Sequence, residues 1–485
     1  MSDKHQYQAG TNFTWPTNLS WILFVFAAFV ILILLPLFQK GVFMDGLLYK
    51  TVAYNYSEGS ASFWNMKFTD TSMTFFCEQP PLYFFLLGMF YKLTAVHYLT
   101  DSLFTLILLT GLLFLLHRIN RLIFKNQDFY LCLILFFLIS IQVFCWGYVN
   151  QVIEPLVCIW VMMGCWSFIK FLKAGKNGYI LLFSLALSLA FLSKGFQSCF
   201  FIGLPLFYYL FNTSKRILRL FLLAGSLLLV VLVFLLQWYK PSLAWFDCYY
   251  NARLLLTMQD VGGTTNNHAD IILWYFTELT VPILSVTCLL IYLRIKKRYP
   301  FYFVFKNFIS DPLAPALLLT SLLGCLPYAL SFVQRAFYLI PSFLLFVLAI
   351  VFGLKRYWLY FYSSLVLLDR HRLTRTIMLV LSFGVVVMFV WGAGDYKRDE
   401  NLIKDIAVIK PFLNEHEIVS IDGNLWNEFS LHSYLYMAKK VSLSVDNSAR
   451  QKVLVRAGSA EEEFEGYTKV EGTKWLDLYI LNPAQ

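Results

Sequence analysis

The side chains best suited to chemistry begin in a long polar loop after the first hydrophobic stretch of the chain. Asp45 comes seven residues after a charge-free run that ends at Phe38, and Tyr49 follows four residues later. Residues four apart share one face of a helix, so both side chains would project together from a short interfacial helix. Further along, Glu78 precedes Gln-Pro-Pro-Leu, and prolines suit the entry of a second short helix over 82–93. A carboxylate held at the membrane surface in this way is the layout expected of an enzyme that acts on a lipid-linked substrate.

Other polar side chains lie at the ends of hydrophobic stretches, where placing a charge near the membrane costs free energy. A charged side chain at mid-membrane costs about 2.5–3.5 kcal/mol on insertion scales. Taken alone, Lys194 or Arg335 is more often an interfacial anchor than a functional group. With Asp45 and Glu78, however, the set falls on one side of the membrane and predicts one extracytoplasmic site with acids, bases and phosphate-binding cations. The additional positions are Glu154, Lys194, Arg253, His268 and the pair Gln334-Arg335.

The elements that must position these groups are membrane-spanning helices. Hydrophobic residues form 59% of the chain and charged residues 14%, and the mean hydropathy is +0.63. Charge-poor stretches close to the roughly 20 residues that cross a bilayer recur along it. The stretch 357–368 is too short to span, and the arginines after it (Arg370, Arg372, Arg375) predict an interfacial helix. We predict eleven crossings, at residues 19–39, 98–117, 129–147, 152–172, 178–193, 197–212, 217–238, 271–293, 312–332, 336–353 and 375–393.

Lysine and arginine predict the orientation, because they gather in cytoplasmic loops. With the N-terminus in the cytoplasm, the five inner loops hold nineteen of them and the outer loops of the membrane part hold eight. Eleven crossings then place the C-terminal segment outside. We therefore expect a multi-pass protein of the cell inner membrane with a periplasmic C-terminal domain. The net charge of +10 is mostly a topology signal and does not indicate a nucleic-acid partner.

Two domains are predicted. Residues 1–394 form the transmembrane domain, whose first outer loop spans 40–97, and residues 395–485 form a soluble extracytoplasmic domain. The second segment is charged and contains strand-like runs such as 417–421 and 476–481, so its 91 residues predict a small α/β domain. The fold class is thus an all-α polytopic membrane protein with interfacial helices in the first outer loop and a small C-terminal α/β domain. We expect that domain to be a passive cap or a module that contacts the acceptor.

The nine cysteines form no CxxC pair, and most lie inside predicted spans, where they pack as small apolar residues. Only Cys77 and Cys248 fall in predicted outer loops, where a disulfide is chemically permitted. The sequence does not decide whether the two are bridged, because the proximity of the loops is itself inferred.

The order of these pieces resembles the polyprenol-phosphate-dependent GT-C glycosyltransferases, in the branch of protein mannosyltransferases and lipid A aminoarabinose transferases. The resemblance covers about 330 residues, 18–349. It departs from the family at Gly46, where many members carry a second acidic residue, at Gln79, which replaces a basic residue or histidine, and after His268, where the usual proline is missing. The matching pieces are the Asp45–Tyr49 pair, the elbow at 78–82, Phe-Leu-Ser-Lys-Gly at 191–195, Asn251-x-Arg253 with His268, and Arg335-x-x-Tyr338-x-x-Pro341.

The resemblance implies an inverting transfer of a sugar from undecaprenyl phosphate to an extracytoplasmic acceptor. Asp45 would be the general base that takes the acceptor's proton, and Glu154 would orient the acceptor or act as a second carboxylate. Lys194, Arg253 and Arg335 would stabilise the departing lipid phosphate, for which arginine offers bidentate contact. Tyr49 and Tyr338 would donate hydrogen bonds to the donor phosphate.

The resemblance also implies a divalent metal, zinc, magnesium or manganese, shared by Glu78 and His268, because some relatives bind one at the matching residues. One carboxylate and one imidazole leave positions unfilled, and His268 is equally well explained as a plain hydrogen-bonding residue. The main alternative function is a transporter or flippase of lipid-linked sugars, although such proteins place ionisable groups near the midplane. A third interpretation, a membrane-anchored scaffold, does not explain the converging charges. The sequence leaves open the sugar, the acceptor (a lipid A-like glycolipid, a glycan or a protein), the polyprenol and the oligomeric state.

Overall fold

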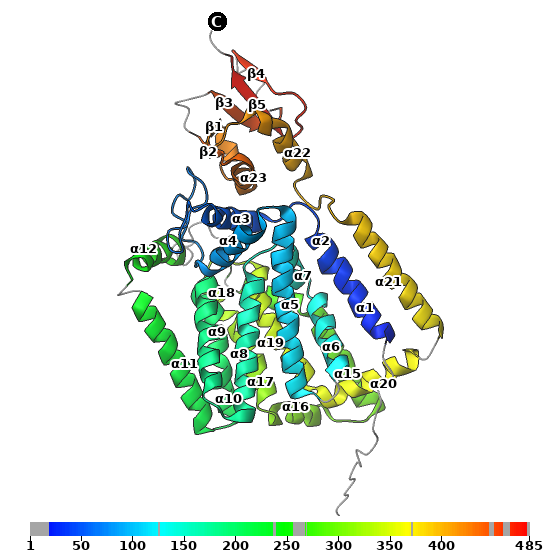
Figure 1. Cartoon of the computed structure of the whole chain (residues 1–485). Helices are drawn as coiled ribbons and strands as arrows, with labels where there is room; N and C mark the ends of the chain where they lie inside the picture. Colours follow the sequence, from blue (N-terminus) through cyan, green and yellow to red (C-terminus); the bar gives the residue numbers. More distant parts are fainter. Residues whose placement is uncertain are drawn as a thin grey trace, which may run out of the picture.

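The computed structural model describes residues 19–124, 127–235, 239–255, 267, 269–369, 372–445, 451–458 and 466–482. Long helices form a bundle, and a small α/β unit sits on one end of it, here called the upper end as it is drawn in Figure 1. The mostly helical membrane part and the small C-terminal sheet confirm the predicted fold class.

The first half of the bundle runs from α1 to α10. Its elements are α1 (Leu19–Phe29), η1 (Val30–Leu34), α2 (Leu35–Leu37), α3 (Met44–Ser57), α4 (Leu82–Thr94), α5 (Tyr98–Ile123), α6 (Gln127–Ser140), α7 (Gln142–Val149), α8 (Glu154–Ala174), α9 (Gly178–Lys194), η2 (Gly195–Ile202) and α10 (Gly203–Phe211). The second half follows with α11 (Lys215–Val233), α12 (Lys240–Tyr249), η4 (Tyr250–Leu255), α14 (Asp270–Glu278), α15 (Thr280–Lys296), α16 (Phe301–Ser310), α17 (Leu313–Leu323), α18 (Leu326–Ala329), η5 (Ala336–Leu339), α19 (Ile340–Gly353), α20 (Lys355–Asp369) and α21 (Arg372–Gly392). The buried helix α19 packs against both α17 and α8 in the middle of the bundle.

Six helices of the described chain are long and apolar enough to cross a membrane, and three sharply bent pairs bring the number to nine. One of the six, Gly178–Phe211, turns back on itself, because Cys199 Sγ lies 3.8 Å from the carbonyl oxygen of Leu187 and the rings of Phe183 and Phe201 are 5.6 Å apart. Twelve residues of straight helix would span about 18 Å, so α9 and α10 are two antiparallel passes. The helix α21 is apolar but shorter than these spans. The described chain thus has several apolar spans, and the number of eleven crossings stays a prediction.

The sequence did not predict three sharp bends, two of which fall inside the predicted crossings 129–147 and 271–293. The helices α6 and α7 meet at 81°, α14 and α15 at 59°, and α16 and the α17–α18 segment at 86°. The predicted interfacial stretch 357–368 falls within α20, which lies with α16 at the lower end of the bundle (Figure 1). The bends matter for the site, because α7 leads directly into the loop before Glu154.

The first outer loop folds into the two expected short helices. The helix α3 begins just before Asp45, and α4 begins at Leu82, directly after the proline pair, as the sequence predicts. Both lie across the upper end of the bundle and under the α/β unit (Figure 1). Asn55 near the end of α3 fixes the rest of the loop, since its Nδ2 donates to the carbonyls of Lys67 and Phe68 at 3.1 and 2.8 Å.

The C-terminal unit is a five-stranded sheet with the order β2-β1-β3-β5-β4, in which β1 pairs in parallel with β2 and β3, and β5 pairs antiparallel with β3 and β4. Val419 lies opposite Leu443, and Leu454 lies opposite Leu478, in an apolar core that α22 and α23 complete. The elements are α22 (Glu400–Ile409), η6 (Lys410–Phe412), β1 (Ile418–Ile421), η7 (Gly423–Leu425), α23 (Phe429–Lys439), β2 (Ser442–Ser444), β3 (Lys452–Arg456), β4 (Tyr467–Lys469) and β5 (Leu476–Leu481).

This unit is docked on the first outer loop. The Tyr436 hydroxyl donates to Asn55 Oδ1 at 3.0 Å in a buried bond, and Lys440 pairs with Glu58 at 2.9 Å. The Thr71 hydroxyl also donates to the carbonyl of Leu443 on edge strand β2 at 2.6 Å. The C-terminal unit and the first outer loop therefore lie on the same side of the membrane. This arrangement requires an even number of membrane crossings between them.

Candidate active site

Asp45 lies in the first turn of α3, where the helix dipole favours a carboxylate. The turn is fixed by the loop after α7: the side-chain oxygen of Asn150 accepts a hydrogen bond from the backbone N–H of Phe43 at 2.9 Å. The two segments touch so closely that a Cβ on Gly46 would lie 2.2 Å from the carbonyl oxygen of Asn150. This contact explains the departure from the family at position 46, because a second acidic side chain does not fit there.

Glu154 and Lys194 form a buried ion pair at the upper end of the bundle. Glu154 is the first residue of α8, with a proline after it, and Lys194 is the last residue of α9; they are 1% and 3% exposed. The ammonium also lies 4.2 Å from the ring centre of Tyr338, in cation–π geometry. The second carboxylate oxygen of Glu154, Oε2, is buried and has no hydrogen-bond partner among the described residues. Such an oxygen is costly unless a ligand satisfies it.

Lys194 differs in one respect from the prediction. The sequence places Lys194 at the end of a hydrophobic stretch, where a lysine is most often an interfacial anchor, whereas Lys194 is buried against the first residue of the neighbouring helix. The reason is the reversal at Gly195, whose φ of +77° lets η2 fold back beside α9. A Cβ on Gly195 would lie 2.7 Å from the Tyr249 hydroxyl oxygen and 3.8 Å from Pro80, so the elbow of the first outer loop and α12 close over this turn.

Tyr49 is the point where the predicted groups meet. It lies one turn after Asp45, and its pKa is raised well above the ordinary value by burial, and further by the charges of Asp45, Glu154 and Glu78 and by the Tyr338 phenol. A phenol that keeps its proton in this setting is a hydrogen-bond donor, as a phosphate ligand requires. Asp45, Tyr49, Glu78, Glu154, Lys194 and Tyr338 thus surround one region, although their roles stay predictions.

The neighbouring residues Gln334 and Arg335 differ in burial. Gln334 is fully buried; its Oε1 accepts from the N–H of Ile271 at 2.9 Å, and its Nε2 donates to the carbonyl of Tyr328 at 3.1 Å. Arg335 itself is exposed. Gln334 therefore fastens this loop to α14, and Tyr338 lies against the Lys194 ammonium. The role of Arg335 stays a prediction.

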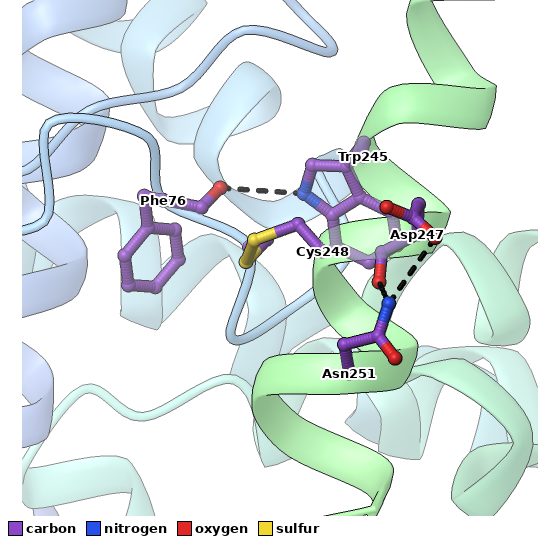
Figure 2. The surroundings of a disulfide bond; sticks show 6 residues. Phe76, Trp245, Asp247, Cys248 and Asn251 are labelled. Atoms are coloured by element: carbon purple, nitrogen blue, oxygen red, sulfur yellow. Dashed lines mark hydrogen bonds between the residues drawn. A yellow bond between two sulfur atoms is a disulfide. The ribbon is translucent and has the colours of Figure 1, made fainter.

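A disulfide joins Cys77, next to Glu78, to Cys248 in α12. Figure 2 shows its surroundings, where Trp245 Nε1 donates to the carbonyl of Phe76 at 3.3 Å. The bond that the sequence left open therefore ties the loop carrying Glu78 to the helix that leads into η4. Arg253 lies in η4, but its side chain is outside the described residues, and so is His268.

The predicted metal site remains untested for the same reason. Within the described ranges, no group of three or more His, Cys, Asp or Glu side chains is placed to hold a metal ion. Glu78 alone does not make a site, and the pairing with His268 stays a prediction.

Sequence reasoning missed Tyr328 and Tyr249. The ring of Tyr328 stacks on that of Tyr338 with centroids 5.1 Å apart, and Lys194 lies 5.8 Å from its centre. Tyr249 approaches Gly195, as described above. No charge or motif marks either tyrosine in an aromatic-rich chain, so only the packing identifies them.

We expect removal of the disulfide to lower both stability and turnover. Cys77→Ser combined with Cys248→Ser should cost about 2–4 kcal/mol of stability, because the bond closes a loop of 171 residues. Turnover should fall about tenfold as the segments around Glu78 and Arg253 lose their fixed spacing. Thermal unfolding and a sugar-transfer assay would measure both effects, with Cys288→Ser, an exposed free thiol, as the control. Wild-type values for both quantities would contradict a positioning role for the bond.

The chain is similar to known proteins in part of its sequence and in its fold. Residues 78–239, about a third of the chain, match the family model for dolichyl-phosphate-mannose-protein mannosyltransferases. The fold is similar to that of ArnT from Cupriavidus metallidurans bound to undecaprenyl phosphate, with a TM-score of 0.63, 12% identity and coverage of 96% of this chain and 99% of that one. The apo structure of that ArnT gives a TM-score of 0.62 at 10% identity, with the same coverage of the two chains. No curated protein sequence matches the chain.

These findings confirm the resemblance drawn from the motifs. The family match begins at Glu78 and includes Glu154 and Lys194, and the shared fold extends over nearly the whole chain. Together they indicate a membrane glycosyltransferase whose fold is similar to that of ArnT.

Proposed function

We propose that this protein transfers a sugar from a polyprenyl phosphate, such as undecaprenyl phosphate, to an acceptor on the extracytoplasmic side, with inversion at the anomeric carbon. The observation that carries the proposal is the meeting of two carboxylates, a buried lysine and two tyrosines at the upper end of the bundle. The structure of ArnT with undecaprenyl phosphate supports the class of donor, since that enzyme shares the fold.

The proposed step is a single displacement. The acceptor hydroxyl oxygen attacks the anomeric carbon, the bond between that carbon and the phosphate oxygen breaks, and the polyprenyl phosphate departs. Asp45, which is half-buried at the start of α3, takes the proton of the hydroxyl. The unsatisfied Oε2 of Glu154 accepts a hydrogen bond from a second acceptor or sugar hydroxyl and so orients it.

Positive charge stabilises the leaving phosphate as negative charge builds on it. Lys194 supplies the buried charge, and its contact with the face of Tyr338 holds the ammonium in place. Arg335 and the predicted Arg253 supply further charge from the rim. Tyr49, which keeps its proton, donates to a phosphate oxygen. A divalent ion at Glu78 and His268 would add positive charge beside the phosphate, but no step depends on it.

We place the site on the periplasmic face of the inner membrane, with the N-terminus in the cytoplasm. The excess of lysine and arginine in the inner loops supports this orientation. The ionisable groups lie at one end of the bundle and not at its middle, which favours an enzyme over the alternative, a flippase for the same lipid-linked sugars.

The test uses purified protein in lipid nanodiscs with a panel of polyprenyl-phosphate sugars and acceptors, and it follows the release of free polyprenyl phosphate. We expect release that depends on both donor and acceptor. A flippase would move the donor across the bilayer without releasing lipid phosphate, and no release across the panel would count against the enzyme. Mass spectrometry of envelope lipids and glycans from a strain that lacks the protein would identify the acceptor.

Addition of EDTA to the release assay tests the predicted metal. If Glu78 and His268 hold a divalent ion, EDTA should abolish the release of polyprenyl phosphate, and one divalent ion should restore it.

A further inference from the structure

The linker between α21 and the C-terminal unit runs along the segment that leads into Asp45. The N–H of Lys40 donates to the carbonyl of Asp395 at 2.7 Å, and the N–H of Lys397 donates to the carbonyl of Lys40 at 3.0 Å. Gly41 has a φ of +82°, and a Cβ on it would lie 2.1 Å from the carbonyl oxygen of Arg398. The last residues before α22 are thus bound to the chain only a few residues before the proposed base.

The side chain of Lys397 reaches from this linker into the bundle. Its Nζ donates to the carbonyl of Pro36 and to that of Val149, both at 2.7 Å. Pro36 lies in the last turn of α2, and Val149 is the last residue of α7. The last carbonyls of a helix carry its negative dipole end and can accept from outside the helix, although the Pro36 carbonyl also accepts from the N–H of Gln39 at 3.3 Å. One lysine thus binds two helix ends at once.

Those two helix ends belong to the segments that carry the two carboxylates. After Val149 comes Asn150, whose side chain holds the N–H of Phe43 two residues before Asp45. Glu154 follows five residues after Val149 and begins the next helix. Lys397 therefore links the chain segment that leads to Asp45 with the chain segment that leads to Glu154.

Other bonds hold each segment separately to its neighbours. The hydroxyl of Ser102 donates to the carbonyl of Leu37 at 2.6 Å, and the hydroxyl of Tyr83 donates to the carbonyl of Gln151 at 3.0 Å. Removal of Lys397 would thus leave the bundle folded while it loosens the link between the two segments.

We propose that Lys397 is a positioning residue for sugar transfer, whose bonds to Pro36 and Val149 set the separation between Asp45 and Glu154. This inference rests on the roles proposed above for the two carboxylates. It also gives the C-terminal segment a part in catalysis, because the linker is held between the docked α/β unit and the site.

The protonation state of Lys397 does not break this bridge. Burial, and to a smaller extent the charge of Lys50, lower its pKa to about 7. The ammonium has three N–H donors and the neutral amine still has two, so both carbonyls keep a donor at neutral pH.

The test compares Lys397→Met, which keeps the length of the side chain but has no donor, with Lys397→Arg and the wild type. The matched control is Lys439→Met, since Lys439 Nζ donates to the carbonyl of Leu413 within the C-terminal unit at 3.0 Å. In Lys397→Met, kcat should fall roughly ten- to a hundredfold with little change in the KM for the donor, as expected when reacting groups shift by about an ångström. Lys397→Arg should recover most of the rate, and Lys439→Met should match the wild type.

Hydrogen exchange gives a second readout that does not need activity. The peptide containing the Phe43 amide should exchange faster in Lys397→Met and at the wild-type rate in Lys439→Met. Wild-type kcat and wild-type exchange in Lys397→Met would overturn the proposal, as would an equal loss in the control. If the wild type itself transfers no sugar, the proposed function fails, while the exchange experiment still decides whether Lys397 holds the two segments.

Discussion

Replacing Asp45 by asparagine should lower the rate of sugar transfer about 10²–10⁴-fold, the usual cost of losing a positioned general base. Asparagine keeps the size and the hydrogen-bonding capacity of the side chain but takes up no proton at neutral pH. The position is half-buried in the first turn of α3, and asparagine is compatible with a helix start, so folding should not change. Release of polyprenyl phosphate by the purified variant measures the rate, and donor binding measured separately should stay near the wild-type value.

Two matched variants separate a base from a binding group. Asp70→Asn changes a carboxylate of the same loop that pairs with Lys67 at 2.7 Å near the surface, and it should leave the rate unchanged. Tyr49→Phe removes one donor near Asp45 and should cost less than Asp45→Asn. Wild-type release by Asp45→Asn would remove the residue from the base role. A binding defect at full single-turnover rate would make Asp45 a substrate ligand instead.

Much of the fold could be predicted because membrane insertion leaves a strong pattern in the sequence. Each crossing needs a long apolar run, and charges gather at its ends, so the eleven runs and the two short helices of the first outer loop are visible without a structure. The breaks are not visible in this way. The bend between α6 and α7 falls inside a continuous apolar run, 129–147, and depends on packing, such as the bond from the N–H of Val143 to Glu278 Oε2 at 3.0 Å.

The site could be predicted as a set of residues but not as a set of contacts. Helix ends on one side of a membrane converge, which is why the sequence groups Asp45, Glu154 and Lys194 into one candidate site. Which charge pairs with which depends on helix neighbours that are distant in sequence. Lys50, which counts as one of the outer-loop lysines in the sequence, is buried and pairs with Asp101 of α5 at 2.8 Å.

The contacts of the C-terminal domain could not be predicted either. Its α/β character follows from composition and strand-like runs, but the way it docks on the first outer loop does not follow from the sequence. The expectation of a passive cap gave no reason to connect Tyr436 with Asn55 or Lys397 with two helix ends. Single hydrogen bonds between segments hundreds of residues apart leave no periodic pattern.

The second large effect is expected at the buried pair of Glu154 and Lys194. Lys194→Met leaves the Glu154 carboxylate buried without its partner, which typically costs about 3–5 kcal/mol of stability. It also removes a fixed charge from the leaving phosphate, and loss of one such group lowers kcat about 10²–10³-fold. Thermal unfolding in detergent measures the first effect, and release of polyprenyl phosphate measures the second. Because the protein is destabilised, this variant alone does not show that Lys194 acts on the substrate.

A double variant separates the two effects. Glu154→Gln together with Lys194→Met removes both charges, so no unpaired ion stays buried, and stability should return close to the wild-type value. Activity should stay lost, because neither the cation nor the second carboxylate is restored. Lys355→Met provides the control: Lys355 pairs with Asp311 at 3.2 Å, both side chains are more than a third exposed, and its loss should cost under about 1 kcal/mol. If the double variant regained transfer along with stability, the pair would serve only to hold α8 against α9, and the charge on the leaving phosphate would have to be met by Arg253 and Arg335 alone.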